Sequence, residues 1–248
     1  MYALTVIGVV AVHIGIISCS SEGAVACLRT LCNEGAHSAG ASNSHPEVSM
    51  HLAPLGNYMN FLDQGDHIAV GDLLLSSAHK LASIGADLLI CPDSSVHLAR
   101  EYVLQHTPLP WLGVTEVVAE RALIDGYKKV GLLGSHWLIQ SKVYQASLDA
   151  YGIECIHISA AAAETVDDIL VNELFSGIQK IQSLRFFQQT VDELKAQGCE
   201  AVILGASEMA LMLGSHNLTL PVLNPAHLLA QEALRCMETS EIQIEISI

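Results

Sequence analysis

A chain of 248 residues, 51% hydrophobic and only 15% charged, can form one large α/β domain or two small ones, and its composition suits strands covered on both faces. The formal net charge of −15 argues against a nucleic-acid partner, because phosphate binding requires clustered Lys and Arg. A small anionic ligand would depend on local positive potential from backbone N–H groups or helix N-termini.

The cysteines, histidines and N-terminal stretch predict no disulfide, metal or membrane contact. Seven cysteines occur without C-x-x-C spacing, which predicts buried, reduced thiols and a cytoplasmic protein. Twelve histidines occur without H-x-H or H-E-x-x-H spacing, so no metal site is predicted. Residues 1–18 are apolar, but they lack a basic region and a small-residue cleavage site and are short for a membrane span. We therefore expect no signal peptide and no membrane partner, and we place the first strand at the end of this stretch.

Strands and helices alternate along the first half of the chain. A polar stretch at 33–44, rich in Ser, Gly and Asn, predicts a loop between the first helix and the second strand. The expected strands are 13–17, 47–51, 85–90 and 109–112, and the expected helices are 24–32, 57–62, 70–84, 97–105 and 116–125.

The run at 85–90 leads into Cys91-Pro92-Asp93-Ser94-Ser95-Val96-His97. An apolar run of strand length that ends in a proline and small polar residues is typical of a buried parallel strand, with its loop at the carboxyl edge of a sheet. Open α/β sheets bind their ligands at that edge. The stretch from Gly198 to Glu208 repeats the pattern more weakly, so we predict that two such loops face each other.

The second half of the chain repeats the first in the same order. Three pairs of segments match, at offsets of roughly 110 to 116 positions: 14–17 with 130–133, 85–90 with 198–203, and 109–112 with 220–223. This repetition predicts an α/β fold of two pseudo-symmetric halves, each a mainly parallel sheet flanked by helices, with the site in the cleft between them. We place the halves at 1–116 and 117–225, followed by a C-terminal helix and tail at 226–248 that can cross over to the first half.

Four motifs carry a resemblance to a known family. They are Cys19-Ser20-Ser21-Glu22-Gly23, the run from Cys91 to His97, Gly131-Leu132-Leu133-Gly134-Ser135, and Leu204-Gly205-Ala206-Ser207-Glu208. Over roughly 13–236 the chain resembles the aspartate/glutamate racemase superfamily, which includes hydantoin racemase, maleate isomerase and arylmalonate decarboxylase. The resemblance implies two pseudo-symmetric halves, no cofactor, a homodimer, and a small amino acid or carboxylic acid as the ligand.

The resemblance also implies a mechanism. In the racemases of this superfamily, two thiols flank the α-carbon of the substrate, one from each half. One takes the α-proton and the other returns a proton on the opposite face, because inverting a stereocentre needs a base and an acid on opposite sides. Without a cofactor, N–H and hydroxyl donors around the carboxylate must stabilise the carbanion-like state.

This sequence departs from the superfamily at both thiol positions. Asp93 stands at the first and Ala206 at the second. Alanine can neither give nor take a proton, so racemisation by a pair of thiols is not expected. Cys91, two residues before Asp93, and Cys199, at the start of its strand, do not replace the pair, and we expect both in the core.

Asp93, His97 and Glu208 are the predicted catalytic residues. Asp93 would be a general base, or a neutral acid in a dry cleft; the alternative is a cap for the helix that follows. His97 would be a proton partner or an orienting donor; the alternative is a buried structural histidine. Glu208 would brace the site or, with Ala206 at the thiol position, act as the nearest titratable group of the second half.

Small residues at the same sheet edge are predicted to bind the substrate. Their hydroxyl and backbone groups would hold a carboxylate, and the alternative is ordinary turn and capping work. The predicted substrate-binding residues are Cys19, Ser20, Ser94, Ser95, Ser135, Ala206 and Ser207. His136 and Trp137 are further candidates for contact with a substrate side chain.

Two functions follow from these residues. The first is a cofactor-independent, racemase-like enzyme that acts at the α-carbon of a small acid similar to aspartate or glutamate. Asp93 would be its surviving base, and a one-base decarboxylation, elimination or isomerisation also fits a single catalytic side. The second is a catalytically silent protein that binds small carboxylates. Ala206 discriminates between them, because a cavity with no acid or base opposite Asp93 favours binding alone or a one-sided reaction.

Overall fold

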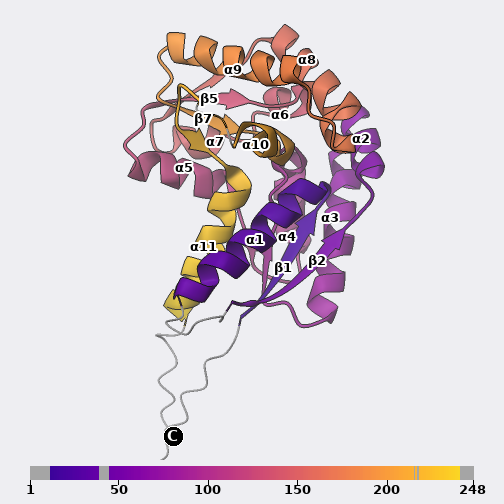
Figure 1. The fold of residues 1–248 in the computed structure, drawn as a ribbon. Coiled ribbons are helices and arrows are strands. Elements are labelled where there is room, and N and C mark those ends of the chain that lie inside the picture. The colour runs from indigo at the N-terminus through magenta and orange to yellow at the C-terminus, as the bar shows by residue number, and fades with distance from the viewer. Residues whose placement is uncertain (1–11, 39–44, 215, 217, 241–248) are drawn as a thin grey trace, which may run out of the picture.

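The computed structural model describes residues 12–38, 45–214, 216 and 218–240. Within them, two parallel four-stranded sheets form, one in each half of the chain (Figure 1). The first, in the order β2-β1-β3-β4, contains β1 (His13–Ser18), β2 (Glu47–Leu52), β3 (Leu88–Ile90) and β4 (Trp111–Leu112). The second, in the order β6-β5-β7-β8, contains β5 (Lys129–Leu133), β6 (Glu154–His157), β7 (Ala201–Leu204) and β8 (Val222–Leu223). The strand order repeats, which confirms the predicted fold of two similar α/β halves.

Helices connect the strands in both halves. Those of the first half are α1 (Ser21–Ser38), α2 (Leu55–Asp63), α3 (His67–Ser83), the 3-10 helix η1 (Ser94–Ala99), α4 (Arg100–His106) and α5 (Val114–Ile124). Those of the second are α6 (His136–Ser141), α7 (Gln145–Asp149), α8 (Ala160–Asn172), the 3-10 helix η2 (Leu174–Ser176), α9 (Ile181–Ala196), α10 (Ser207–Leu213) and α11 (Pro225–Ser240).

The first sheet is covered by helices on both faces, which is why its strands are apolar on both sides. On one face, Ile16 of β1 packs in a buried cluster with Leu31 of α1 and Leu229 of α11. On the other face, Ile17 packs in a cluster with Leu74 of α3. The alternation of neighbouring strand residues between two cores is the period of two that an extended strand imposes.

Two helices join the halves. α11 follows the last strand of the second sheet, yet it lies along α1 of the first half (Figure 1). α5 contributes Val114 and Val117 to a core of the first half, and Val118 and Ala122 to a core of the second. The boundary predicted between residues 116 and 117 therefore lies inside a helix that both halves share.

α1 is longer than the sequence predicts. A loop is expected from residue 33, but the helix continues to Ser38, and residues 39–44 lie outside the described part of the chain. A Cβ atom at Gly35 would lie 3.1 Å from Cδ2 of Leu234 on α11 and 3.1 Å from Cδ of Pro46. Packing against α11 at such close range keeps this polar stretch helical, because tertiary contacts outweigh weak local propensity.

The other predicted strands and helices of the first half are confirmed within a few residues of their expected ends. The segment predicted as a helix over 97–105 begins earlier, with the 3-10 turns of η1. Residues 1–11, in the apolar N-terminal stretch, lie outside the described residues. None of the helices in the described ranges has the length and apolar character needed to cross a membrane.

Candidate active site

Asp93 lies at the carboxyl ends of two adjacent parallel strands. It follows β3 closely, and β3 pairs with β1, which ends at Ser18. The Ser18 hydroxyl donates to Oδ2 of Asp93 at 2.5 Å, and the backbone N–H of Cys19 donates to the same oxygen at 2.8 Å. Two donors on one oxygen stabilise a carboxylate. The side chain makes no capping bond to η1, so the capping alternative for Asp93 is not what the structure shows.

Glu208 is the opposing carboxylic acid, in the first turn of α10, and only 4% of its surface is exposed. Burial raises its pKa to about 7, and the charge of Asp93 acts in the same direction. Hydrogen bonds to Glu208 from its own backbone N–H and from the Ser20 hydroxyl oppose that rise. Ser20 also accepts the backbone N–H of Gly23 at 3.2 Å, so it links the start of α1 to the acid of the second half.

Gly23 allows the two halves to approach each other at this point. A Cβ atom at this position would lie 3.0 Å from Cγ of Pro92, 3.2 Å from Oγ of Ser207 and 3.3 Å from Oδ1 of Asp93. The Asp93 carboxylate and the Ser207 hydroxyl, which belong to different halves, therefore both pack closely against this glycine. A side chain at position 23 would force these groups to move.

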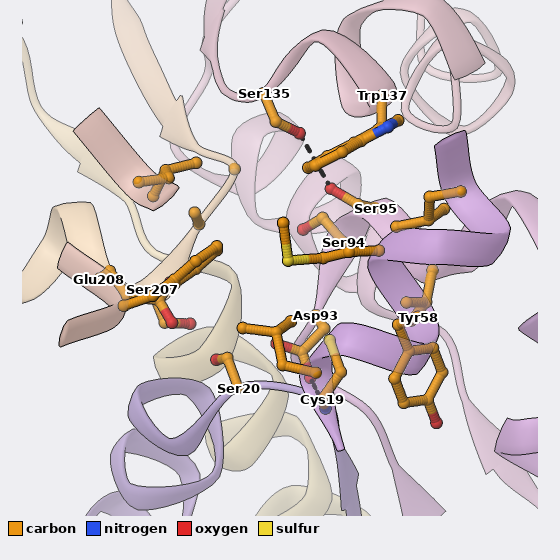
Figure 2. A pocket seen from close by; sticks show the side chains of 18 of the residues that line it. Cys19, Ser20, Tyr58, Asp93, Ser94, Ser95, Ser135, Trp137, Ser207 and Glu208 are labelled. Atoms are coloured by element: carbon orange, nitrogen blue, oxygen red, sulfur yellow. Dashed lines mark hydrogen bonds between the residues drawn. The ribbon is translucent and has the colours of Figure 1, made fainter. Parts of the chain in front are cut away.

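A cavity of about 60 Å³ lies between the two strand edges, several times the roughly 10–15 Å³ that one water occupies on this measure. Figure 2 shows Cys19, Ser20 and Asp93 at its floor and Ser207 with Glu208 at its side. The lining residues from the predicted set are Cys19, Ser20, Asp93, Ser94, Ser95, Ser135, Ala206, Ser207 and Glu208. The structure thus brings together nine of the ten predicted site residues.

His97 is the exception. It does not line this cavity but a much smaller one beside Leu74 and Arg100. Its ring Nδ1 lies 3.0 Å from the backbone carbonyl oxygen of Asp93; a carbonyl only accepts, so Nδ1 carries the proton. Burial lowers the pKa of His97 and keeps the ring neutral. The structure therefore fits the alternative of a buried structural histidine. Its ring hydrogen-bonds to the backbone of the Asp93 loop and does not line the cavity.

Three of the predicted serines join the halves. The hydroxyl of Ser94 lies 2.7 Å from the buried hydroxyl of Tyr144, which precedes α7. Ser95 and Ser135 lie 3.3 Å apart, oxygen to oxygen (Figure 2). Ser135 also caps α6 by accepting the N–H of Leu138 at 3.4 Å. These hydroxyls line the cavity and also fix the relative position of the two sheets.

The thiols near the site are protonated. Burial raises the pKa of Cys19 well above its ordinary value, and the negative charge of Asp93 raises it further. Cys91 is fully buried beneath the loop, and burial likewise raises its pKa. Cys199 lies in the core of the second half, so Cys91 and Cys199 are core residues, as predicted. Ala206 packs against the same core and lines the cavity with a methyl group.

Of the two residues after Ser135, only Trp137 lines the cavity, and its ring Nε1 donates to Asp63 of α2 at 3.0 Å. His136 faces a separate groove, and its Nδ1 lies 2.5 Å from Asp167. No group of three or more His, Cys, Asp or Glu side chains in the described ranges could hold a metal ion.

Sequence reasoning missed two groups of residues. Ser18 and Tyr144 are partners of predicted residues; Ser18 ends a strand at the site edge and could have been found by the rule that found Asp93. Apolar side chains complete the wall: Leu55, Tyr58, Met59, Leu62, Val96, Leu170, Phe175 and Leu204. Three of them, at positions 55, 59 and 62, share one face of α2 by helical spacing, but nothing local shows that this face meets the second half.

Fold and site together define a two-half α/β protein with a cavity where the carboxyl edges of two parallel sheets face each other, the place where open α/β sheets bind small molecules. The family model of Asp/Glu/Hydantoin racemase matches residues 14–233. The chain belongs to this family.

Individual relatives are distant in sequence. The chain is 24% identical over 200 residues to the broad specificity amino-acid racemase RacX of Bacillus subtilis (strain 168), covering 79% of this chain and 84% of that protein. An aspartate racemase homologue from Pyrococcus horikoshii OT3 superposes with a TM-score of 0.74 at 21% identity, covering 91% of this chain and 99% of the other. Picrophilus torridus aspartate racemase gives a TM-score of 0.71 at 16% identity, with coverages of 92% and 94%. At these identities the solved structures establish the fold alone.

Proposed function

We propose that this protein catalyses proton transfer at the α-carbon of a small amino acid or carboxylic acid, without a cofactor. Membership of the racemase family supports this class of reaction, and RacX is by its name a broad-specificity amino-acid racemase. The observation that carries the proposal is the pair of carboxylic acids, Asp93 and Glu208, that line one cavity from opposite halves. The free, reduced cysteines support a cytoplasmic location, and the family resemblance supports a homodimer.

Asp93 is the base. Ser18 and Cys19 hold its Oδ2, which leaves Oδ1 as the oxygen available to the cavity that Asp93 lines. In the proposed step the α-carbon–hydrogen bond breaks and an O–H bond forms at Oδ1. The electron pair stays on the substrate and spreads into its carboxylate, where hydroxyl and N–H donors stabilise it. Desolvation of the cavity strengthens each of these contacts.

Glu208 is the acid on the other side. With a pKa of about 7, it holds a proton that it can give up near neutral pH, which is the range where an acid–base catalyst is most effective. Delivery of that proton to the opposite face of the α-carbon would invert the stereocentre. Asp93 then holds a proton and Glu208 a charge, and the same pair can run the reaction in reverse on the other enantiomer.

The absence of a titratable group at Ala206 favours a second candidate, a protein that binds small carboxylates without turning them over. The methyl group of Ala206 occupies the position at which the resemblance implies the second thiol. If Glu208 does not reach the α-carbon, only Asp93 remains, and the chemistry is one-sided or absent.

Proton exchange separates these possibilities. The protein is incubated in D₂O with L- and D-forms of several amino acids, and NMR follows the α-proton while chiral chromatography follows the enantiomers. We expect loss of the α-proton together with formation of the other enantiomer. Exchange with retained configuration would instead indicate one-base chemistry by Asp93, and binding without exchange would identify the silent binder.

Variants assign the roles. Asp93→Asn keeps the shape of the side chain but removes the base, so exchange should fall by about 10² to 10⁴-fold while ligand binding persists. Asp72→Asn, on the outer face of α3, is the matched control. It removes an exposed carboxylate whose one side-chain hydrogen-bond partner among the described residues is Tyr102. Unchanged exchange in Asp93→Asn would remove this residue from the mechanism.

A further inference from the structure

Among the described residues, the cavity is lined by two carboxyl groups and by no cationic side chain. Asp93 and Glu208 are its titratable carboxyl groups, and none of the described residues that line it is Lys, Arg or His. An open groove of about 550 Å³ adjoins it, sharing Cys19, Ser20 and Glu208, and adds the acid Glu22. That groove, too, has no cationic side chain among its described lining residues. A ligand entering the cavity therefore meets negative or neutral groups along its whole path.

One part of the cavity wall is apolar. Leu55, Met59 and Leu62 of α2 face it, and Leu170 of α8 and Phe175 of η2 approach from the second half. These side chains offer no hydrogen-bond donor to a charged group. They form a surface suited to a hydrocarbon side chain.

The polar side chains near this wall are few, and each has a hydrogen-bond partner within the protein. The indole N–H of Trp137 donates to Asp63 at 3.0 Å. The hydroxyls of Ser95 and Ser135 lie against each other at 3.3 Å, and Figure 2 shows this pair and Trp137 across the cavity from Ser20 and Glu208. A second carboxylate placed here would meet no cationic side chain among the described lining residues, and the Ser95–Ser135 pair would have one hydroxyl proton to offer it.

From this arrangement we infer that the ligand is an α-amino acid with an uncharged, apolar side chain, of the size of leucine or methionine, and not aspartate or glutamate. Its ammonium group faces the acids Asp93 and Glu208, and its side chain lies on the α2 wall around Met59. The inference deepens the proposed function and rests on it for the role of the cavity, but binding selectivity tests it separately from turnover.

Charge decides against the acidic amino acids. A zwitterion enters with a net charge of zero, whereas aspartate carries an extra negative charge into a cavity that already holds two carboxyl groups. Burying an unpaired carboxylate against apolar side chains removes its hydration without a compensating partner. Leucine has nearly the shape of aspartate, with two methyl groups in place of two oxygens, so this pair of ligands isolates the charge.

The test is a direct binding measurement by calorimetry on the full chain, with leucine against aspartate and methionine against glutamate at constant ionic strength. We expect leucine to bind roughly 100-fold more tightly than aspartate, and methionine to be preferred over glutamate in the same sense. Equal binding of leucine and aspartate, preference for aspartate, or no binding of either apolar amino acid would each overturn the inference.

A designed charge sharpens the test. Met59 is half-buried on a helix, and arginine is a good helix former of similar length, so Met59→Arg places a cation on the apolar wall. This variant should bind leucine about tenfold more weakly and aspartate about tenfold more tightly than the parent protein. Asn57→Arg adds the same charge at an exposed position of the same helix and should leave both affinities unchanged. A selectivity ratio that is the same in both variants would place the side chain elsewhere and overturn the assignment.

Failure of this inference is distinguishable from failure of the proposed function. If leucine binds selectively but its α-proton does not exchange in D₂O, the proposed catalysis is wrong and the side-chain class stands. If aspartate exchanges faster than leucine, catalysis stands and the side-chain class is wrong.

Discussion

The two halves have the same strand order, but they hold their carboxylic acids by opposite means. In the first half, Asp93 lies on the loop after β3, and the Ser18 hydroxyl and the Cys19 backbone N–H both donate to its Oδ2. In the second half, the equivalent loop after β7 carries Ala206, and the acid is displaced to Glu208 in the first turn of α10. Burial, not hydrogen bonding, dominates there and raises the pKa of Glu208 to about 7.

This difference shows how a duplicated scaffold can carry an asymmetric pair. Hydrogen-bond donors contact one carboxyl group, whereas burial raises the pKa of the other. Two carboxyl groups that line one cavity therefore lie in different environments, the condition under which one serves as base and the other as acid in many active sites. Ser20 couples them, because it belongs to the first half yet hydrogen-bonds to Glu208.

The largest effect is expected from removing the buried acid, Glu208→Gln. An unfolded glutamic acid ionises near pH 4.5, whereas folded Glu208 keeps its proton up to about 7. The folded state therefore binds more protons in this window, and the stabilisation present below about pH 4.5 is lost as the pH rises through 7. The variant has no ionisable group at this position and does not lose this stabilisation. The difference in the free energy of unfolding between variant and parent should therefore shift by about 3 kcal/mol in favour of the variant from low to high pH.

Urea denaturation of both proteins over this pH range measures the change. Glu101→Gln is the control, since the carboxylate of Glu101 is exposed at the start of α4. Its free energy of unfolding, plotted against pH, should run parallel to that of the parent. A Glu208→Gln curve that also runs parallel to the parent would mean that burial does not hold this proton.

Removing a donor from the first half tests the other side of the comparison. Ser18 is fully buried and donates to the Asp93 carboxylate; hydrogen bonds to charged groups contribute about 1.5–3 kcal/mol. Ser18→Ala should therefore lower the exchange rate roughly tenfold or more, with a smaller effect on ligand affinity. Ser141→Ala, which removes a hydroxyl that donates to the carbonyl of Leu138 in its own helix at 2.9 Å, serves for comparison. Equal rates in the two variants would show that Ser18 does not support the base.

A smaller effect is expected from the contact that holds the halves together. Tyr144→Phe removes the hydroxyl 2.7 Å from Ser94 and leaves the buried serine without this partner, at a cost of about 1–2 kcal/mol in stability. Combined with Ser94→Ala in a double-mutant cycle, the pair should show a coupling energy near 1 kcal/mol. Strictly additive effects would contradict a contact between the halves at this point.

The smallest effect is a gain of function from Ala206→Cys. This change restores a thiol at the position that the resemblance assigns to the second catalytic group, on a half-buried site that already lines the cavity. We expect a modest increase in racemisation over the parent, measured by chiral chromatography, with Ala206→Ser as the control of similar size. A folded Ala206→Cys protein with no gain would mean that the cavity has moved away from two-thiol geometry.

The sequence alone determines the repeated α/β pattern and the two loops at the strand ends. Apolar runs followed by small polar residues specify parallel strands because both faces of such strands are buried, and the same order occurs twice. Asp93 and Glu208 follow those strands closely, so each could be assigned to the carboxyl edge of its own sheet without knowledge of the packing. The end of α1 could not be predicted in the same way, because contact with Leu234 of α11, 199 positions beyond Gly35, keeps that polar stretch helical.

The tertiary structure alone decided which predicted residues line the cavity and what surrounds them. His97 and Asp93 are four residues apart, yet the 3-10 turns of η1 turn the histidine ring away from the cavity while the aspartate lines it. The apolar wall of α2 meets the acids only because the two sheets face each other across the cleft. Distances across that cleft, and the burial that raises the pKa of Glu208, depend on packing between segments more than a hundred residues apart, which no local pattern records.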